Sequence, residues 1–102
     1  RRSWLAHVLQ PQGTLQLDPG ACEALLQRGA SLLQVGITAV EGEFGASQAV
    51  NLVDPDGRLL GRGLCSQASA ALRHGLGAAA EDRPSAVVVH RDALVLSDRL
   101  LP

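Results

Sequence analysis

Two stretches in the first half of the 102-residue chain show an alternating pattern. In each, every second residue is apolar and the residues between are more polar or smaller. The first stretch covers residues 14–17. The second places Leu33, Val35, Ile37 and Ala39 on one side. Because the side chains of a strand point to its two faces in turn, each stretch predicts a strand with one face on the core.

Apolar segments predict four further strands, arranged as two pairs. Residues 50–52 and 59–64 flank an Asp-Pro-Asp-Gly turn signal at 54–57, which predicts an antiparallel hairpin. The second pair consists of the valine run at 87–89 and the apolar run at 94–96, with a short polar segment between them.

Two helices are predicted from their end signals. Asp18 is a good N-cap, Pro19 suits the first helical position, and Gly29 can take the left-handed conformation that ends a helix. A second helix is predicted after Ser66, which would cap it, and before Gly75, which would end it.

The order of these elements is β-α-β-β-β-α-β-β, a mainly β fold with two short helices. Tight turns and few helices favour a small pseudo-barrel over a doubly wound parallel sheet, which needs a helix after nearly every strand. We expect one domain over residues 1–102, with a loop at 75–85. The chain begins Arg-Arg without methionine, so we also expect a piece of a longer protein in which residues 1–10 form a linker.

The amino-acid composition argues against some classes of function, among them membrane-spanning proteins and strong nucleic-acid binders. Hydrophobic residues make up 46% of the chain, enough for a packed core. No apolar run approaches the ~20 residues of a membrane helix. The net charge is −1 and aromatic residues account for 2%. A strong nucleic-acid binder would usually show a basic surface, and a single-strand RNA reader would show stacking aromatics.

Candidate catalytic and metal-binding motifs are incomplete. Cys22 and Cys65 are far apart and form no Cys-x-x-Cys pair, so no zinc site is predicted. Two free thiols are favoured, although the spacing leaves a disulfide open. The Gly-Arg-Gly sequence at 61–63 is half of a dinucleotide fingerprint, but Ser66 stands where the third glycine should be.

The triplet His90-Arg91-Asp92 matches the start of a protein-kinase catalytic loop. Ser97 stands where that loop needs a metal-binding asparagine, and the chain contains no lysine. The alternative that we favour is a structural turn held by local hydrogen bonds and a salt bridge.

Six short sequence segments along the chain resemble the same known family. They lie, in order, at residues 13–15, 18–26, 29–37, 40–44, 56–64 and 90–96. Together they resemble the PUA domain at the C-terminal end of glutamate 5-kinases. Residues 45–47 depart from the family pattern because they lack its aspartate.

The resemblance implies a parent enzyme that phosphorylates the γ-carboxylate of L-glutamate with ATP and Mg²⁺, the first step of proline biosynthesis. That chemistry belongs to an upstream amino-acid-kinase domain in the cytoplasm. The present chain would be non-catalytic, without a cofactor or metal of its own. It would have a regulatory or assembly role, in contact with the kinase domain or with other copies.

The resemblance also implies an alternative, RNA binding through the PUA surface. The first helix and the strand after it would then face the nucleic acid. The expected contacts are Arg28, Ser31, Gly36 and Arg91.

Overall fold

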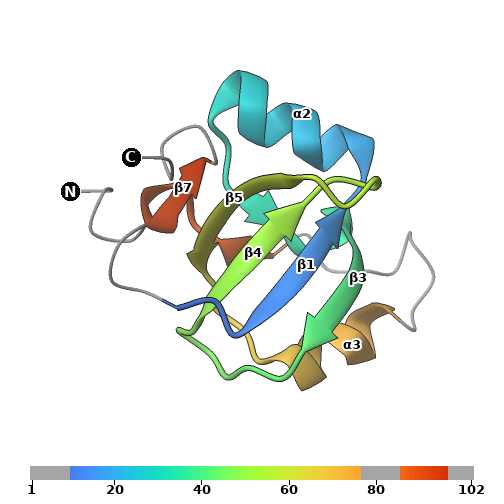
Figure 1. Cartoon of the computed structure of the whole chain (residues 1–102), viewed down its shortest axis with the longest axis vertical. Helices are drawn as coiled ribbons and strands as arrows, with labels where there is room; N and C mark the ends of the chain where they lie inside the picture. The colour runs from blue at the N-terminus through green and yellow to red at the C-terminus, as the bar shows by residue number, and fades with distance from the viewer. Residues whose placement is uncertain (1–9, 77–85, 97–102) are drawn as a thin grey trace.

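The computed structural model describes residues 10–76 and 86–96. A five-stranded mixed sheet has the strand order β3-β1-β4-β5-β7 (Figure 1). Its strands are β1 (Gly13–Leu17), β3 (Ile37–Gly42), β4 (Ala49–Val53), β5 (Leu59–Leu64) and β7 (Leu94–Leu96). Strand β1 pairs antiparallel with β3 and parallel with β4. The β4–β5 pair is the predicted antiparallel hairpin.

A second, two-stranded sheet joins β2 (Leu32–Leu33) to β6 (Val87–Val89). Two α-helices, α2 (Pro19–Arg28) and α3 (Ser69–Leu76), lie above and below the larger sheet's strands in the view of Figure 1. Short 3₁₀ turns, η1 (Gln34–Gly36) and η3 (Arg91–Ala93), precede β3 and β7. The predicted class, mainly β with two short helices, is confirmed, with one predicted strand divided into two.

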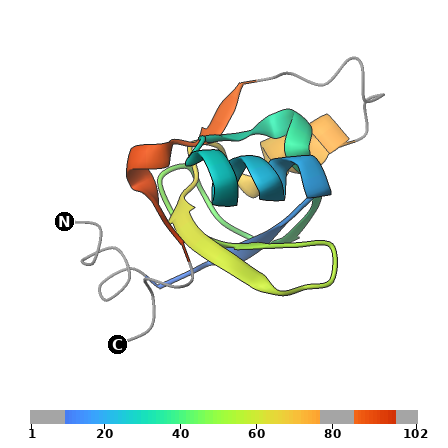
Figure 2. The ribbon, with the colours of Figure 1, turned by 90° about the horizontal axis from the view of Figure 1, so that it is seen from above.

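Helix α2 begins and ends where the sequence predicts. The Asp18 carboxylate accepts a hydrogen bond from the Ala21 N–H at 2.7 Å. Gly29 has a φ of 59°, and its N–H bonds to the Ala24 carbonyl. Leu25 is buried on the inner side of the helix. In Figure 2, α2 lies beside η1 and across the larger sheet.

The core is a single cluster of hydrophobic side chains between the two helices and the sheets. The most deeply buried members include Leu15, Leu17, Leu25, Leu32, Ile37, Leu52, Leu72 and Val88. Strands β1, β3 and β4 of the larger sheet each contribute residues to that list. Strands β5 and β7 contribute Leu60 and Leu94, which belong to the same cluster. The alternation of the sequence therefore identified the core residues of β1, β3 and β4.

The predicted strand over residues 33–39 is wrong in its middle, where η1 separates β2 from β3. Leu33, at the end of β2, and Val35, in η1, are 37% and 40% exposed, while Gln34 and Gly36 are buried. A Cβ on Gly36 would lie 2.7 Å from the Cβ of Ala21 in α2. This close approach needs a turn rather than an extended strand, and the turn reverses which residues face the core before Ile37.

The second helix also differs from its predicted ends. It begins at Ser69, because Ser66 is held by β6 instead: its hydroxyl donates to the Val87 carbonyl at 3.1 Å. The helix continues through Gly75 to Leu76. Gly75 lies against the side-chain amide of Gln34, where a Cβ would have no space. The glycine thus permits a close contact and does not end the helix.

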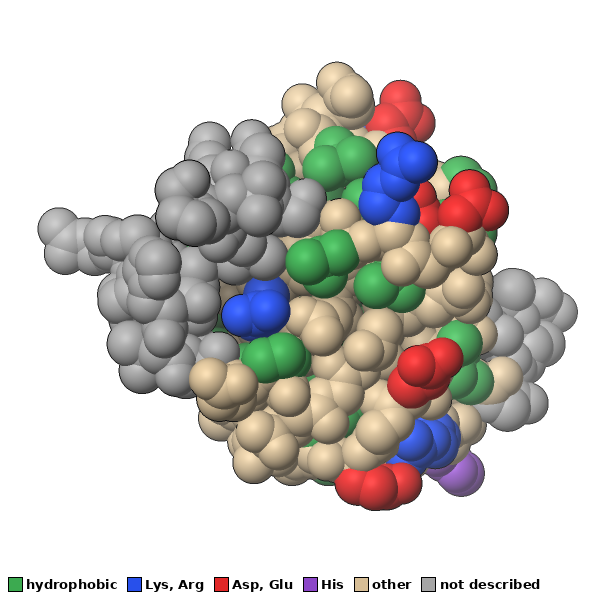
Figure 3. All heavy atoms as spheres, in the orientation of Figure 1, with side chains coloured by type: hydrophobic (Ala, Val, Ile, Leu, Met, Phe, Trp, Pro, Cys, Tyr) green, Lys and Arg blue, Asp and Glu red, His purple; other side chains and the backbone are tan. Residues whose placement is uncertain are grey.

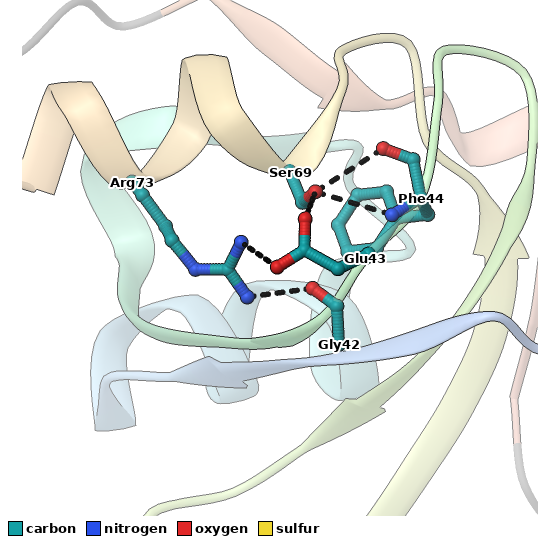
Figure 4. Close-up of polar contacts among 5 residues, drawn as sticks. All are labelled: Gly42, Glu43, Phe44, Ser69 and Arg73. Carbon is teal, nitrogen blue, oxygen red and sulfur yellow. Dashed lines mark hydrogen bonds and ion pairs between the residues drawn. The ribbon is translucent and has the colours of Figure 1, made fainter.

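Polar contacts join α3 to the end of β3 (Figure 4). The buried Ser69 hydroxyl accepts from the Phe44 N–H at 3.1 Å and can donate to the Phe44 carbonyl at 3.2 Å. Nearby, Arg73 pairs with the Glu43 carboxylate at 3.0 Å and donates to the Gly42 carbonyl at 2.6 Å. The serine contact is buried and the ion pair is exposed, so the serine should matter more for stability.

We expect Ser69→Ala to lower the free energy of unfolding by about 1–3 kcal/mol, because it leaves the buried Phe44 N–H without a partner. Ser66→Ala, which removes an exposed hydrogen bond, should cost less than about 1 kcal/mol. Urea unfolding of both variants measures the difference. Equal losses, or a larger loss for Ser66→Ala, would contradict the importance of the Ser69 contact.

Residues 1–9, 77–85 and 97–102 lie outside the described part of the chain. The predicted linker and most of the predicted 75–85 loop fall there and stay predictions, as does the one-domain assignment for residues 1–102. Within the described ranges, neither helix is long and apolar enough to cross a membrane.

Candidate functional site

A groove of about 350 Å³ lies between α2 and the β2–η1 segment. Ala21 and Ala24 line its helical side, and Leu33 and Val35 line the opposite side. Arg28, the last residue of α2, is its cationic residue. A groove with small and apolar walls and a few polar groups is typical of a binding site.

Ser31 connects this groove to a segment sixty residues further along the chain. Its hydroxyl oxygen accepts a hydrogen bond from the Arg91 backbone N–H at 2.8 Å. A smaller hollow of about 100 Å³ next to this contact is lined by Arg91, Leu25 and Ala30, among others. Ala30 borders both hollows, so they form adjoining parts of one surface.

The structure brings together all four residues that the sequence assigned to the alternative RNA surface. Arg28, Ser31 and Gly36 line the groove, and Arg91 lies beside it. Gly36 is buried, and its carbonyl accepts from the Asp18 N–H at 2.9 Å. Its visible role is therefore to let α2 approach η1, whereas the two arginines are exposed to solvent.

Charge near the groove is sparse and of both signs, because Asp18 and Arg28, at the two ends of α2, both line it. Within residues 10–76 and 86–96, Arg73 pairs with Glu43 and no acidic side chain pairs with Arg28 or Arg91. On the face shown in Figure 3, acidic and basic side chains are interspersed and no broad basic patch appears. The surface could hold one or two anionic groups more readily than a long polyanion.

The His90-Arg91-Asp92 triplet forms the η3 turn. The His90 Nδ1 atom accepts from the Asp92 N–H at 3.1 Å and lies 3.6 Å from an Asp92 carboxylate oxygen. The Ala93 N–H bonds to the His90 carbonyl at 2.8 Å. The side chains are exposed, and these contacts are the local ones expected of a structural turn.

The described residues hold no cluster of three or more His, Cys, Asp or Glu side chains that could bind a metal ion. Both cysteines are free and buried. Burial raises the pKa of the Cys65 thiol, and burial followed by the charges of Asp54 and Asp18 raises the pKa of Cys22. Because the thiolate is the nucleophile, neither cysteine is prepared for covalent chemistry at neutral pH.

These raised pKa values predict a loss of stability in alkali. The unfolded chain releases its thiol protons as the pH passes roughly 8.5, whereas the folded chain still holds them, so the free energy of unfolding should fall above that pH. The chain has no tyrosine or lysine to mask the effect. Urea unfolding between about pH 7 and 10 measures it.

Cys65→Ala is the matched control for this prediction. It removes the thiol that is fully buried, so its pH profile should be flatter than that of the wild-type chain. A wild-type stability that stays constant or rises above about pH 9 would contradict the prediction.

An exposed apolar cluster beside the groove was not predicted. Leu33 and Val87 are cross-strand partners in the small sheet, and Val35 follows in η1. Their exposed fractions are 37%, 43% and 40%. The signal for it was Gly36, since a glycine inside an alternating segment marks a bulge or a close backbone approach.

A mixed sheet with two helices and a groove beside α2 defines a small, mainly β domain. A family model for the PUA domain matches residues 13–82, and the chain belongs to this family. Over 99 residues, 97% of its length, it is 69% identical to glutamate 5-kinase of Parasynechococcus marenigrum. The chain spans only 28% of that relative.

Solved structures agree on the fold. A PUA domain from Aeropyrum pernix K1, crystallised as a tartrate complex, matches 78% of this chain and 41% of its own, with a TM-score of 0.68 and 26% identity. A conserved PUA domain protein from Thermoplasma acidophilum matches 74% of this chain and 46% of its own, with a TM-score of 0.59 and 16% identity.

Proposed function

We propose that this chain is the non-catalytic accessory PUA domain of a glutamate 5-kinase, with a regulatory or assembly role. The observation that carries the proposal is its 69% identity, over nearly its whole length, to 28% of a glutamate 5-kinase. So high an identity over one part favours the same place in the same kind of protein.

The proposal assigns the chemistry to the rest of the parent chain. An upstream amino-acid-kinase domain would bind ATP and Mg²⁺ and phosphorylate L-glutamate in the cytoplasm, for proline biosynthesis. In the described part of the present chain, the raised thiol pKa values and the structural His90-Arg91-Asp92 turn offer no replacement for that chemistry.

The test separates the two parts of the parent. We expect the isolated 102-residue chain to show no glutamate-dependent ATP turnover, and the parent protein without this domain to keep at least a tenth of its turnover, because the reacting groups remain. Steady-state assays of the parent, the truncated parent and the isolated chain measure both. Turnover by the isolated chain, or a parent without glutamate kinase activity, would overturn the proposal.

RNA binding at the α2 groove is the second candidate. It is favoured by the position of Arg28 and Arg91 on the two sides of Ser31, with no acidic partner in the described ranges. Arginines in such positions can contact phosphate oxygens, while the groove accommodates a base or sugar.

The expected affinity of this surface is low and falls with salt. Two phosphate contacts to single-stranded RNA give a slope of log K against log salt of about −1.4, at roughly −0.7 for each contact. Replacing both Arg28 and Arg91 with glutamine should abolish this slope, whereas Arg58→Gln, in the β4–β5 hairpin, should leave it unchanged. Fluorescence titrations with single-stranded RNA at several salt concentrations measure it. The absence of salt-dependent binding at high micromolar protein concentration would exclude this candidate.

A further inference from the structure

The small β2–β6 sheet presents an apolar surface to solvent. Its inner pair, Leu32 and Val89, is almost completely buried, whereas its outer pair, Leu33 and Val87, is more than a third exposed. Val35 extends the outer pair along η1 and reaches the groove beside α2. We call Leu33, Val35 and Val87 the outer valine–leucine face.

This face gathers three of the five large hydrophobic side chains that are exposed in the described part of the chain. No arginine is among its members, and the polar Gln34 between Leu33 and Val35 is turned into the interior. The side chains of this face cannot donate hydrogen bonds to phosphate oxygens, and they can pack against apolar side chains of a protein.

The size of the face decides what kind of protein contact it can make. Three partly covered Val and Leu side chains offer at most a few hundred Å². A stable complex between separate proteins needs about 800 Å² from each partner. A second copy of this chain would therefore bind too weakly through this face alone. A partner on the same polypeptide needs far less area, because a short linker holds it at an effective concentration of roughly millimolar.

We infer that the outer valine–leucine face docks this domain onto the remainder of its own parent polypeptide. The inference rests on the proposed function, because the chain spans only 28% of the glutamate 5-kinase that it matches and the rest of that length supplies the partner. The partner surface is apolar, and contact with it covers Leu33, Val35 and Val87.

Hydrogen–deuterium exchange on the full-length parent tests the docking. Peptides that contain residues 31–38 and 86–90 should exchange at least tenfold more slowly in the parent than in the isolated chain. In the parent carrying Leu33→Gln and Val87→Thr, these rates should return to within about twofold of those of the isolated chain. Leu59→Gln is the matched control, because Leu59 is also 37% exposed but lies in β5 of the other sheet, and it should keep the slow exchange.

The outcomes distinguish this inference from the proposed function. Equal exchange in the wild-type parent and the isolated chain overturns the docking even if the double variant fails to fold, and glutamate kinase activity of the same sample leaves the proposed function standing. Slow exchange in a parent without that activity overturns the proposed function alone. Protection of the isolated chain by its own concentration, or by added RNA, would assign the face to a second copy or to nucleic acid and would also overturn the inference.

Discussion

The contact between Gly36 and Ala21 is the constraint on which the groove and its surroundings depend. A Cβ at residue 36 would lie 2.7 Å from the Ala21 Cβ, and the Gly36 carbonyl accepts the Asp18 N–H at 2.9 Å. The start of α2 is therefore fixed to η1 by both packing and a hydrogen bond. This arrangement turns Val35 toward solvent and leaves the groove between the helix and η1.

Buried polar groups complete the positioning of α3. Gln34 enters the interior because η1 reverses the strand alternation, and its side chain accepts a hydrogen bond from Gln67 at 3.4 Å and packs against Gly75. Ser69 makes the second buried contact, to Phe44. In the described ranges, every buried side-chain nitrogen and oxygen has a hydrogen-bond partner. The η1 turn thus contacts both helices, through Gly36 at α2 and Gln34 at α3.

The sequence predicted the features that local chemistry determines. The ends of α2 follow from Asp18 and Gly29, and the β4–β5 hairpin follows from its turn residues. It failed where a distant segment decides the outcome. Gly36 is matched to Ala21 on a different element, and Ser66 bonds to β6 instead of capping α3. A glycine inside an alternating segment signals a close approach, but the local sequence does not say which distant residue it meets.

The same distinction applies to the candidate site. The four residues chosen from the resemblance lie on one surface. This is expected because a sequence motif shared within a family accompanies a shared fold. The exposed apolar face was missed, because alternation assigned Leu33 to the core. This error bears on function. With two arginines that form no ion pair within the described ranges, the surface can release only a few counterions, so its affinity for RNA is limited. Apolar contact between two parts of one polypeptide has no such limit, since covalent connection already meets most of the entropic cost of association. The physical balance at this surface therefore favours a partner within the same protein over a nucleic acid in solution.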